Sequence, residues 1–311
     1  TAYEIRNCDW SSDVCSSDLK LASNENPLGV SKKVQKAIND SVSNLNRYPD
    51  GNCFELKEAI AKKHNVSSDM VSLGNGSNEL LELVARVFVS RGTDEVIFSQ
   101  YAFVVYPLVT QALGATAVIS PAKNYGHDLD SMLSLISNET KLIFIANPNN
   151  PTGTLLSDEK IYKFLNLVPR GIPVVLDQAY FEYLNIDDQA ISWLNEFENL
   201  IISRTFSKAY GLAGLRVGYS ICSPLIADYI NRVREPFNVN HTAQMAAIAA
   251  LNDDDYLEDS VRLNADGYEQ LTNGFKALNL NYIPSYANFI DRKSTRLNSS
   301  YSSVSRMPSS A

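Results

Sequence analysis

The spacing of apolar residues predicts alternating strands and helices across the central half of the chain, residues 71–221. Short continuous apolar runs indicate strands that are buried on both faces, and apolar residues three and four positions apart indicate amphipathic helices. The predicted strands cover residues 71–73, 95–98, 116–119, 142–146, 173–176, 200–203 and 217–221, and the helices among them cover 79–89, 104–113, 130–136 and 158–167. This alternation favours an α/β fold with a mostly parallel central sheet covered by helices.

The same pattern predicts more helices before and after this region. Residues 32–42 and 54–64 precede it, and residues 225–234, 243–251 and 256–278 follow it, while 280–283 and 289–290 look like strands of a second sheet. We therefore expect an N-terminal arm with part of a small domain at 19–50 and a large cofactor-binding domain at 51–254. A smaller α/β domain begins at 255–291 and is incomplete.

Both ends of the chain are dominated by polar residues. Residues 1–18 are rich in Ser and Asp, and residues 292–311 are mostly Ser with little apolar content. Such segments bury too little apolar surface to offset the entropy lost on ordering. We expect residues 1–18 and 292–311 to be disordered or foreign to the coding sequence, and the fold prediction excludes them.

Composition narrows the class of protein. The chain has 311 residues, of which 45% are hydrophobic and 20% charged, with a net charge of −8. The negative charge argues against nucleic acid or an anionic membrane as partner. No apolar run approaches the roughly 20 residues that span a bilayer, and no secretion signal is evident. Three histidines and four scattered cysteines show no metal-ligand spacing, so we expect a cytoplasmic protein without a metal site.

The candidate chemistry centres on Lys208, in the run SRTFSKAYGL at residues 203–212. A lysine amine forms Schiff bases with aldehydes, as pyridoxal 5'-phosphate (PLP) requires. Asp177 ends another apolar run, and a carboxylate there would keep a pyridine nitrogen protonated. Because sites in parallel sheets lie at the carboxyl ends of strands, we expect Lys208 and Asp177 to line one pocket. In isolation, a strand-end Asp is equally typical of a turn.

A phosphate site is predicted at residues 74–78 (GNGSN), which join a strand to a helix. Glycines allow close backbone approach, and a helix N-terminus offers free N–H groups. Thr205 and Ser207 would add hydroxyls and Arg216 a forked charged contact. Taken alone, such a glycine turn is more often a plain connection, and Arg216 would more often be part of a surface ion pair.

Three further residues are candidates for contacts with the cofactor ring. Tyr180 and Asn150 would donate to its phenolic oxygen, and Tyr101 would stack on its face. The Asn/Pro stretch that contains Asn150 is also a tight turn, and core packing is a comparable alternative for Tyr101.

Taken together, these motifs resemble fold-type I PLP enzymes, and specifically the histidinol-phosphate aminotransferase family. The resemblance spans about residues 19–290 and rests on KLASNENPLG, NRYPDG, LGNGSNELLELVARVF, ANPNNPTG, VVLDQAYFEY, SRTFSKAYGLAGLRVGY and SYANFI. It implies Lys208 as the Schiff-base lysine and catalytic proton carrier, assisted by Asp177 and Tyr180. It also implies a cofactor-binding set of Tyr48, Gly76, Ser77, Asn78, Tyr101, Asn150, Asp177, Tyr180, Thr205, Ser207, Lys208 and Arg216. Tyr48 would reach the neighbouring subunit's phosphate site, which implies a homodimer.

The reaction implied is transfer of an amino group from L-histidinol phosphate to 2-oxoglutarate, giving imidazole-acetol phosphate and L-glutamate in histidine biosynthesis. Two alternatives on the same scaffold are an aromatic-amino-acid aminotransferase and a threonine-phosphate decarboxylase; a third is a catalytically inactive PLP-binding fragment. Two departures from the family matter. Gln178 stands where an acidic residue is usual, and the chain looks C-terminally truncated, without the arginine that grips the substrate α-carboxylate.

Overall fold

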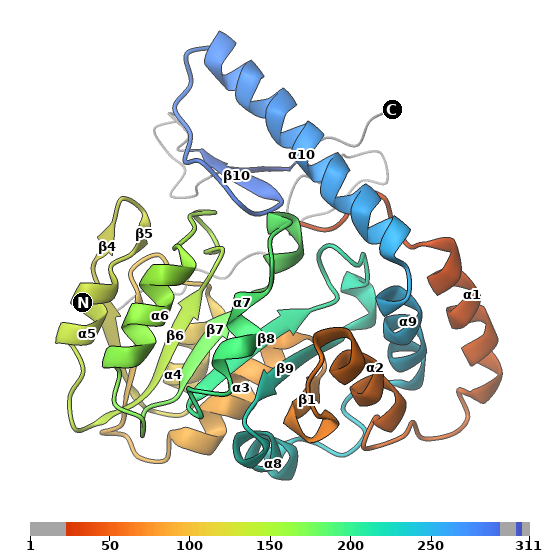
Figure 1. Cartoon of the computed structure of the whole chain (residues 1–311), viewed down its shortest axis with the longest axis horizontal. Coiled ribbons are helices and arrows are strands. Elements are labelled where there is room, and N and C mark those ends of the chain that lie inside the picture. The colour runs from red at the N-terminus through yellow and green to blue at the C-terminus, as the bar shows by residue number, and fades with distance from the viewer. Residues whose placement is uncertain (1–22, 293–302, 307–311) are drawn as a thin grey trace.

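A seven-stranded sheet forms the centre of the molecule (Figure 1). The computed structural model describes residues 23–292 and 303–306. Across the sheet the strands run in the order β1, β9, β8, β7, β6, β2, β3. Their bounds are β1 (Val71–Gly74), β2 (Glu95–Ser99), β3 (Thr116–Ser120), β6 (Thr140–Ala146), β7 (Val174–Asp177), β8 (Leu200–Thr205) and β9 (Gly218–Cys222). A small hairpin, β4 (Ala122–Lys123) with β5 (Gly126–His127), lies apart from the sheet and was not predicted.

Strand directions confirm the predicted mostly parallel sheet. β3, β2, β6, β7 and β8 pair in parallel, whereas β9 is antiparallel to both β8 and β1. Helices connect the parallel strands, but β8 reaches β9 through residues 206–217, which contain only the 3₁₀ turn η4 (Ala213–Leu215). Consecutive strands without a crossover helix pair antiparallel, because a parallel partner needs the chain to return to the other end of the sheet.

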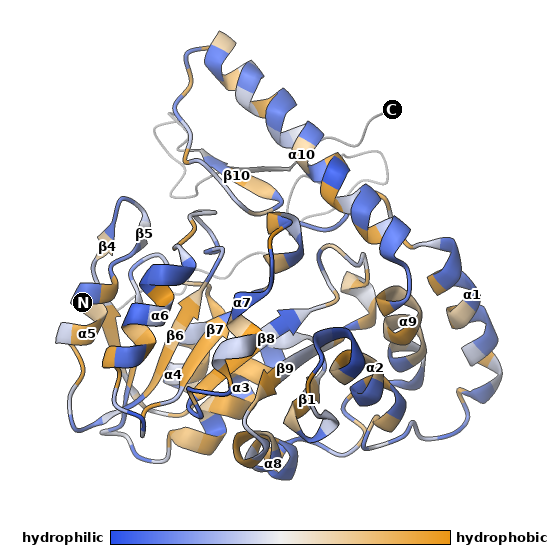
Figure 2. Cartoon of the chain, in the orientation of Figure 1, coloured by the Kyte–Doolittle hydropathy of each residue, from blue (hydrophilic) through white to orange (hydrophobic). Residues whose placement is uncertain are grey.

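Alternate residues of the inner strands β2, β6, β7 and β8 enter different cores. In β6, Ile143 and Ile145 belong to one buried cluster, and Leu142 and Phe144 belong to the other. Since successive side chains point to opposite faces, a continuously apolar strand needs cover on both sides. Figure 2 shows the apolar strands in the interior and mixed helices around them. The predicted α/β class is therefore confirmed.

The predicted helices are confirmed to within a few residues. Local signals explain their starts: Ser31 and Asn240 accept hydrogen bonds from N–H groups of the first turns that follow them, and Pro224 opens a third helix. The helices are α1 (Lys32–Ser41), α2 (Phe54–His64), α3 (Ser77–Phe88), α4 (Val105–Ala112), α5 (Leu129–Ser134), α6 (Asp158–Leu167), α7 (Gln189–Trp193), α8 (Pro224–Val233), α9 (His241–Leu251) and α10 (Asp254–Ala277). Three further 3₁₀ turns are η1 (Val42–Asn44), η2 (Ser68–Met70) and η3 (Phe181–Leu184).

The C-terminal part differs from the prediction in two places. Residues 280–283 do not form a strand; the backbone N–H of Ile283 donates to Asp291, and Pro284 then removes the next donor. The strand β10 (Phe289–Arg292) pairs antiparallel with β11 (Ser303–Arg306). Residues 303–306 are thus a strand inside the segment expected to lack regular structure, because a strand edge offers hydrogen bonds whatever the composition of its partner. Residues 1–18, 293–302 and 307–311 of the predicted terminal segments lie outside the described residues.

The C-terminal elements and the N-terminal arm lie at the carboxyl ends of the parallel strands. In Figure 1, α10 and β10 lie beyond the ends of β6, β7 and β8. The backbone N–H of Tyr286 donates to the carbonyl of Gly153 over 2.8 Å, and the side chain of Asn26 donates to the carbonyl of Ala209 over 2.8 Å.

In the described part of the chain, no helix is long and apolar enough to cross a bilayer. Nor does that part hold a cluster of three or more potential metal ligands. The boundaries at 50, 254 and 291 remain predictions.

Candidate functional site

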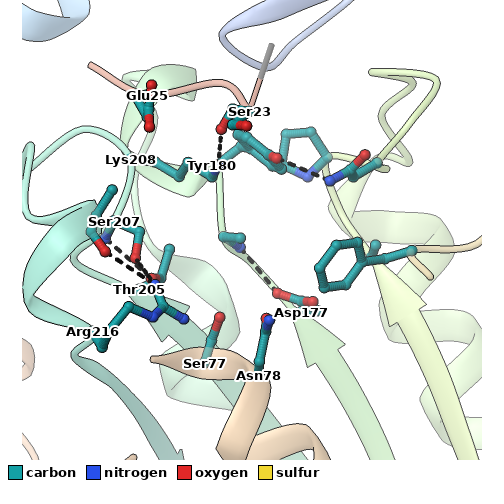
Figure 3. A pocket seen from close by; sticks show the side chains of 16 residues that line it. Ser23, Glu25, Ser77, Asn78, Asp177, Tyr180, Thr205, Ser207, Lys208 and Arg216 are labelled. Carbon is teal, nitrogen blue, oxygen red and sulfur yellow. Dashed lines mark hydrogen bonds between the residues drawn. The ribbon is translucent and has the colours of Figure 1, made fainter. Parts of the chain in front are cut away.

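A cavity of about 470 Å³ opens where the parallel strands end (Figure 3). β6 and β7 end at its wall with Ala146 and Asp177, β8 ends there with Thr205, and α3 begins there with Ser77. The predicted residues that line it are Ser77, Asn78, Asn150, Asp177, Tyr180, Thr205, Ser207, Lys208 and Arg216. The cavity therefore collects, from five segments, most of the residues that the sequence motifs single out.

The buried carboxylate of Asp177 forms one wall of the cavity. Its Oδ2 accepts a hydrogen bond from the Tyr106 hydroxyl at 2.8 Å, and its Oδ1 accepts from the backbone N–H of Ala179 at 3.2 Å. Burial raises the pKa of Asp177 to about 6, against the opposing effects of these two donors and of the Lys208 charge. A cationic N–H group placed against this carboxylate would offset that burial and favour its charged form.

Lys208 reaches the cavity from the loop after β8. Its Nζ donates to the carbonyl oxygens of Ser23 at 3.1 Å and Asn24 at 3.3 Å, and it lies 5.6 Å from the centroid of the Tyr180 ring (Figure 3). The arm thus holds the amine beside the phenol and within electrostatic reach of Asp177. An aromatic aldehyde bound here would meet the amine and the carboxylate together.

Tyr180 and Asn150 meet on another side of the cavity. The Tyr180 hydroxyl accepts from Nδ2 of Asn150 at 3.1 Å and from Nδ2 of Asn24 at 3.3 Å. Burial raises the pKa of this phenol above its ordinary value, so it keeps its proton at neutral pH. Its O–H and the Asn150 amide are two neighbouring donors that suit a single oxygen anion.

Four side chains and a helix N-terminus form the anion-binding corner of the cavity. An Arg216 Nη1 donates to the Ser207 hydroxyl at 3.3 Å, and the Ser207 backbone N–H donates to Thr205 Oγ1 at 3.1 Å. Ser77, at the start of α3, faces Arg216 in Figure 3. Arg216 itself has a left-handed backbone with φ of 55°, which costs free energy, and its guanidinium lies against Gly76 at the start of α3. Hydroxyls, a guanidinium and helix N–H groups suit a phosphate.

Two glycines allow this corner to close. Gly76 has φ of 77°, and a Cβ there would overlap the guanidinium of Arg216. A Cβ on Gly218, in β9, would overlap the backbone nitrogen of Ser77. Gly76 was predicted for the phosphate site. Gly218 was not, because nothing near it in the sequence shows that β9 crosses beneath the start of α3.

The first prediction concerns Gly76→Ala. We expect it to weaken PLP binding by about tenfold or more, because the methyl group displaces Arg216 and with it a charged hydrogen bond worth roughly 1.5–3 kcal/mol. Gly114→Ala is the matched control: its φ is 70°, but no atom lies within 4 Å of the added Cβ. Both variants suffer backbone strain of about 1 kcal/mol. Fluorescence titration with PLP measures the affinities, and equal affinity in the two variants would remove Gly76 from the site.

Three predicted residues are not among those that line the cavity in the described chain: Gly76, which lies against Arg216, and the two tyrosines Tyr101 and Tyr48. Tyr101, expected to stack on the cofactor ring, is 36% exposed and packs beside Tyr125 with 5.9 Å between ring centroids. Phe103 lines the cavity instead, because the loop after β2 turns Tyr101 outward before α4 begins. Tyr48 is 83% exposed and stacks on Phe237 at 4.7 Å.

The sequence analysis missed other residues that shape the cavity. Tyr106 is fully buried, stacks on Phe144 at 4.5 Å and holds Asp177. Ser23 and Glu25 line the cavity from the arm. The aromatic run 101–106 contains Tyr106, and the motif KLASNENP contains Ser23 and Glu25. Neither pattern shows which of its side chains turn toward the cavity.

The residues present fit PLP. The anion-binding corner suits its phosphate, Asp177 its ring nitrogen, Tyr180 with Asn150 its phenolic oxygen, and Lys208 its aldehyde. Gly76 supports this fit, because the absence of a side chain there lets the Arg216 guanidinium lie against the N-terminus of α3, and a cation beside helix N–H groups suits an anion.

Comparisons with known proteins agree with this chemistry. Residues 16–293 match the sequence pattern of the family of class I and II aminotransferases. A histidinol-phosphate aminotransferase of Methylobacillus flagellatus is 57% identical over 274 residues, which cover 88% of this chain and 74% of that protein. Histidinol-phosphate aminotransferase 2 of Pseudomonas fluorescens strain Pf-5 is 56% identical over the same shares of the two chains.

Solved structures give the same result. The histidinol-phosphate aminotransferase of Sinorhizobium meliloti, in complex with PLP, has a TM-score of 0.82 and 30% identity, and covers 87% of this chain and 74% of its own. The enzyme of that name from Clostridium acetobutylicum has a TM-score of 0.82 and 27% identity, and covers 90% and 84%.

Proposed function

The chain belongs to the family of class I and II aminotransferases, and from that premise we propose that it transfers the amino group of L-histidinol phosphate to 2-oxoglutarate. The products are imidazole-acetol phosphate and L-glutamate, in histidine biosynthesis, and the cofactor is PLP. The single observation that carries the chemistry is the placement of Lys208, Asp177 and the anion-binding corner around one cavity. The substrate rests on relatives of 50–57% identity that bear this function in their names.

PLP, when bound, supplies an aldehyde that captures amines and a ring that withdraws electrons from the substrate Cα. We propose that Nζ of Lys208 would hold the aldehyde carbon and, once the substrate amine replaces it there, would move a proton between the substrate Cα and the cofactor. Asp177 would keep the ring nitrogen protonated, and Tyr180 and Asn150 would donate hydrogen bonds to the phenolic oxygen. The anion-binding corner fixes the orientation of the ring, which keeps the reacting atoms aligned.

We further propose that the working unit is a cytoplasmic homodimer in which Tyr48 serves the partner's cavity. The exposure of Tyr48 and its support by Phe237 favour this role, because a large exposed aromatic ring held on a second ring is typical of an interface. Arg47 and Pro49 flank it in the motif that carries the resemblance.

The second prediction tests the substrate. Purified protein loaded with PLP is mixed with L-histidinol phosphate, phenylalanine or threonine phosphate, and the loss of the visible cofactor band is followed in a single half-reaction. We expect histidinol phosphate to convert the cofactor at least about tenfold faster than phenylalanine, since a phosphate contact adds about 1.5–3 kcal/mol of binding. A faster reaction with phenylalanine, or release of CO₂ from threonine phosphate, would replace the proposed substrate.

A further inference from the structure

A buried arginine lies in the strand that leads to Lys208. Arg204 is in β8, four residues before Lys208, and its side chain is only 2% exposed. A guanidinium does not lose its charge in a protein, so burying it is unfavourable unless its hydrogen bonds and its charge are both satisfied. The partners of Arg204 therefore indicate what holds this part of the site in place.

Arg204 joins the ends of two neighbouring strands. Its Nε and Nη2 donate to Oε1 of Gln178 at 3.2 Å and 2.7 Å. Gln178 directly follows Asp177, and its backbone N–H also donates to the carbonyl of Ser203 at 2.8 Å. These hydrogen bonds join the end of the strand that carries Asp177 to the strand that leads to Lys208. We name this pair of side chains the Arg204–Gln178 clamp.

Gln178 is neutral, so the negative charge near Arg204 comes from elsewhere. Oδ2 of Asp188, just before α7, lies 2.8 Å from Nη2 of Arg204 and 3.6 Å from Nδ1 of His64. Burial alone would raise the pKa of Asp188, but His64 and Arg204 outweigh it and bring the pKa below its ordinary value. The guanidinium also lies 4.0 Å from the centroid of the Phe181 ring.

We propose that Arg204 is a positioning residue that sets the separation of Asp177 and Lys208 through the Arg204–Gln178 clamp, with Asp188 as its counter-ion. The inference rests on the proposed function, because it assigns a role in holding the cofactor-binding residues. It accounts for a chain in which residue 178 is an amide: Asp188, eleven positions from Asp177, supplies the carboxylate in direct contact with Arg204, and the partly buried Glu182 is a second acidic group nearby.

The third prediction tests this with three variants of the full chain. Asp188→Asn should lower the melting temperature of the PLP-free protein by about 5 °C and weaken PLP binding on the order of tenfold. Gln178→Glu introduced into Asp188→Asn should restore most of both, because it places a carboxylate in direct contact with Arg204. Asp187→Asn is the matched control, since Asp187 is adjacent and exposed.

Calorimetry measures the melting temperatures, and fluorescence titration measures the affinity for PLP. The inference is overturned if Asp188→Asn behaves as Asp187→Asn does, or if Gln178→Glu restores nothing. It is also overturned as a positioning role if stability falls while the affinity for PLP and its visible absorption stay those of the wild type. A wild-type protein that binds no PLP would instead contradict the proposed function, while the melting temperatures would still test the counter-ion.

Discussion

Lys208→Ala should abolish the visible absorption of the PLP-loaded protein and slow the amino-transfer half-reaction by about 10⁴-fold or more. Positioned acid–base groups contribute roughly 10²–10⁴-fold, and this variant also loses the covalent anchor. In the wild type, the amine of Lys208 lies beside the Tyr180 ring in the cavity and donates to the carbonyls of Ser23 and Asn24 in the arm. Absorption spectra and single-turnover kinetics measure the two effects.

Two controls separate chemistry from folding. Lys208→Arg keeps the positive charge but cannot react with an aldehyde, so we expect it to be as inactive as Lys208→Ala. Lys141→Ala removes a lysine that also donates to a backbone carbonyl, that of Asn138 at 2.7 Å, but lies at the start of β6, whose other end borders the cavity. It should retain wild-type absorption. Substantial turnover in Lys208→Arg would contradict the assigned role.

Asp177→Asn should have opposite effects on catalysis and on stability. Without a carboxylate against the ring nitrogen, we expect the half-reaction to slow by about 10²–10³-fold, the scale of losing a preorganised charge. The PLP-free variant should nevertheless be more stable than the wild type at pH 7.5. In the PLP-free protein the charged form of Asp177 is buried without a cationic partner from the cofactor, which is unfavourable.

The sign follows from the raised pKa of Asp177. In the unfolded chain a carboxyl group loses its proton near pH 3.8, but the folded protein holds this proton up to about pH 6. Between these values the folded state binds more protons, so the stability contributed by Asp177 falls as the pH rises from about 4 to 6 and stays low above. The full difference corresponds to about 3 kcal/mol. Asparagine carries no charge and avoids this loss.

Denaturant unfolding of PLP-free protein at pH 4.5 and pH 7.5 measures the effect. The stability advantage of Asp177→Asn should be largest at pH 7.5 and small at pH 4.5. Asp94→Asn is an informative control, because backbone N–H groups of Ser90 and Arg91 lower the pKa of Asp94. Its loss should therefore destabilise the protein at pH 7.5. An Asp177→Asn variant that is less stable than the wild type at pH 7.5 would show that the charged carboxylate of Asp177 does not destabilise the PLP-free protein.

Most secondary structure was predictable because it follows from local rules. The helix at 54–64 lies where its apolar spacing predicts it, and helix starts coincide with capping residues such as Ser31 and Asn240. Residues 280–283 show the limit of those rules. Their apolar pattern fits a strand, but a strand also needs a partner with a free edge, and that depends on residues distant in the sequence.

The site divides in the same way. Lys208 and Asp177 were predictable because each follows a buried strand, and parallel strands end at a common edge of the sheet. Phe103 was not distinguishable from Tyr101, since the direction of a loop side chain depends on backbone angles that the pattern does not encode. Tyr106 and Arg204 look like ordinary helix and strand residues, and only the packed molecule shows their partners, Asp177 and Asp188.

By itself, the sequence determined the fold class, the edge of the sheet that carries the site and the residue types available for its chemistry. Those properties depend on the period of apolar residues and on short motifs, which neighbouring residues define. The tertiary structure alone decided which aromatic ring enters the cavity, which hydroxyl holds Asp177 and which carboxylate balances Arg204. Some of these contacts join residues that are distant in the sequence, and others depend on which of two neighbouring loop side chains turns inward. Both depend on the packing of the folded chain.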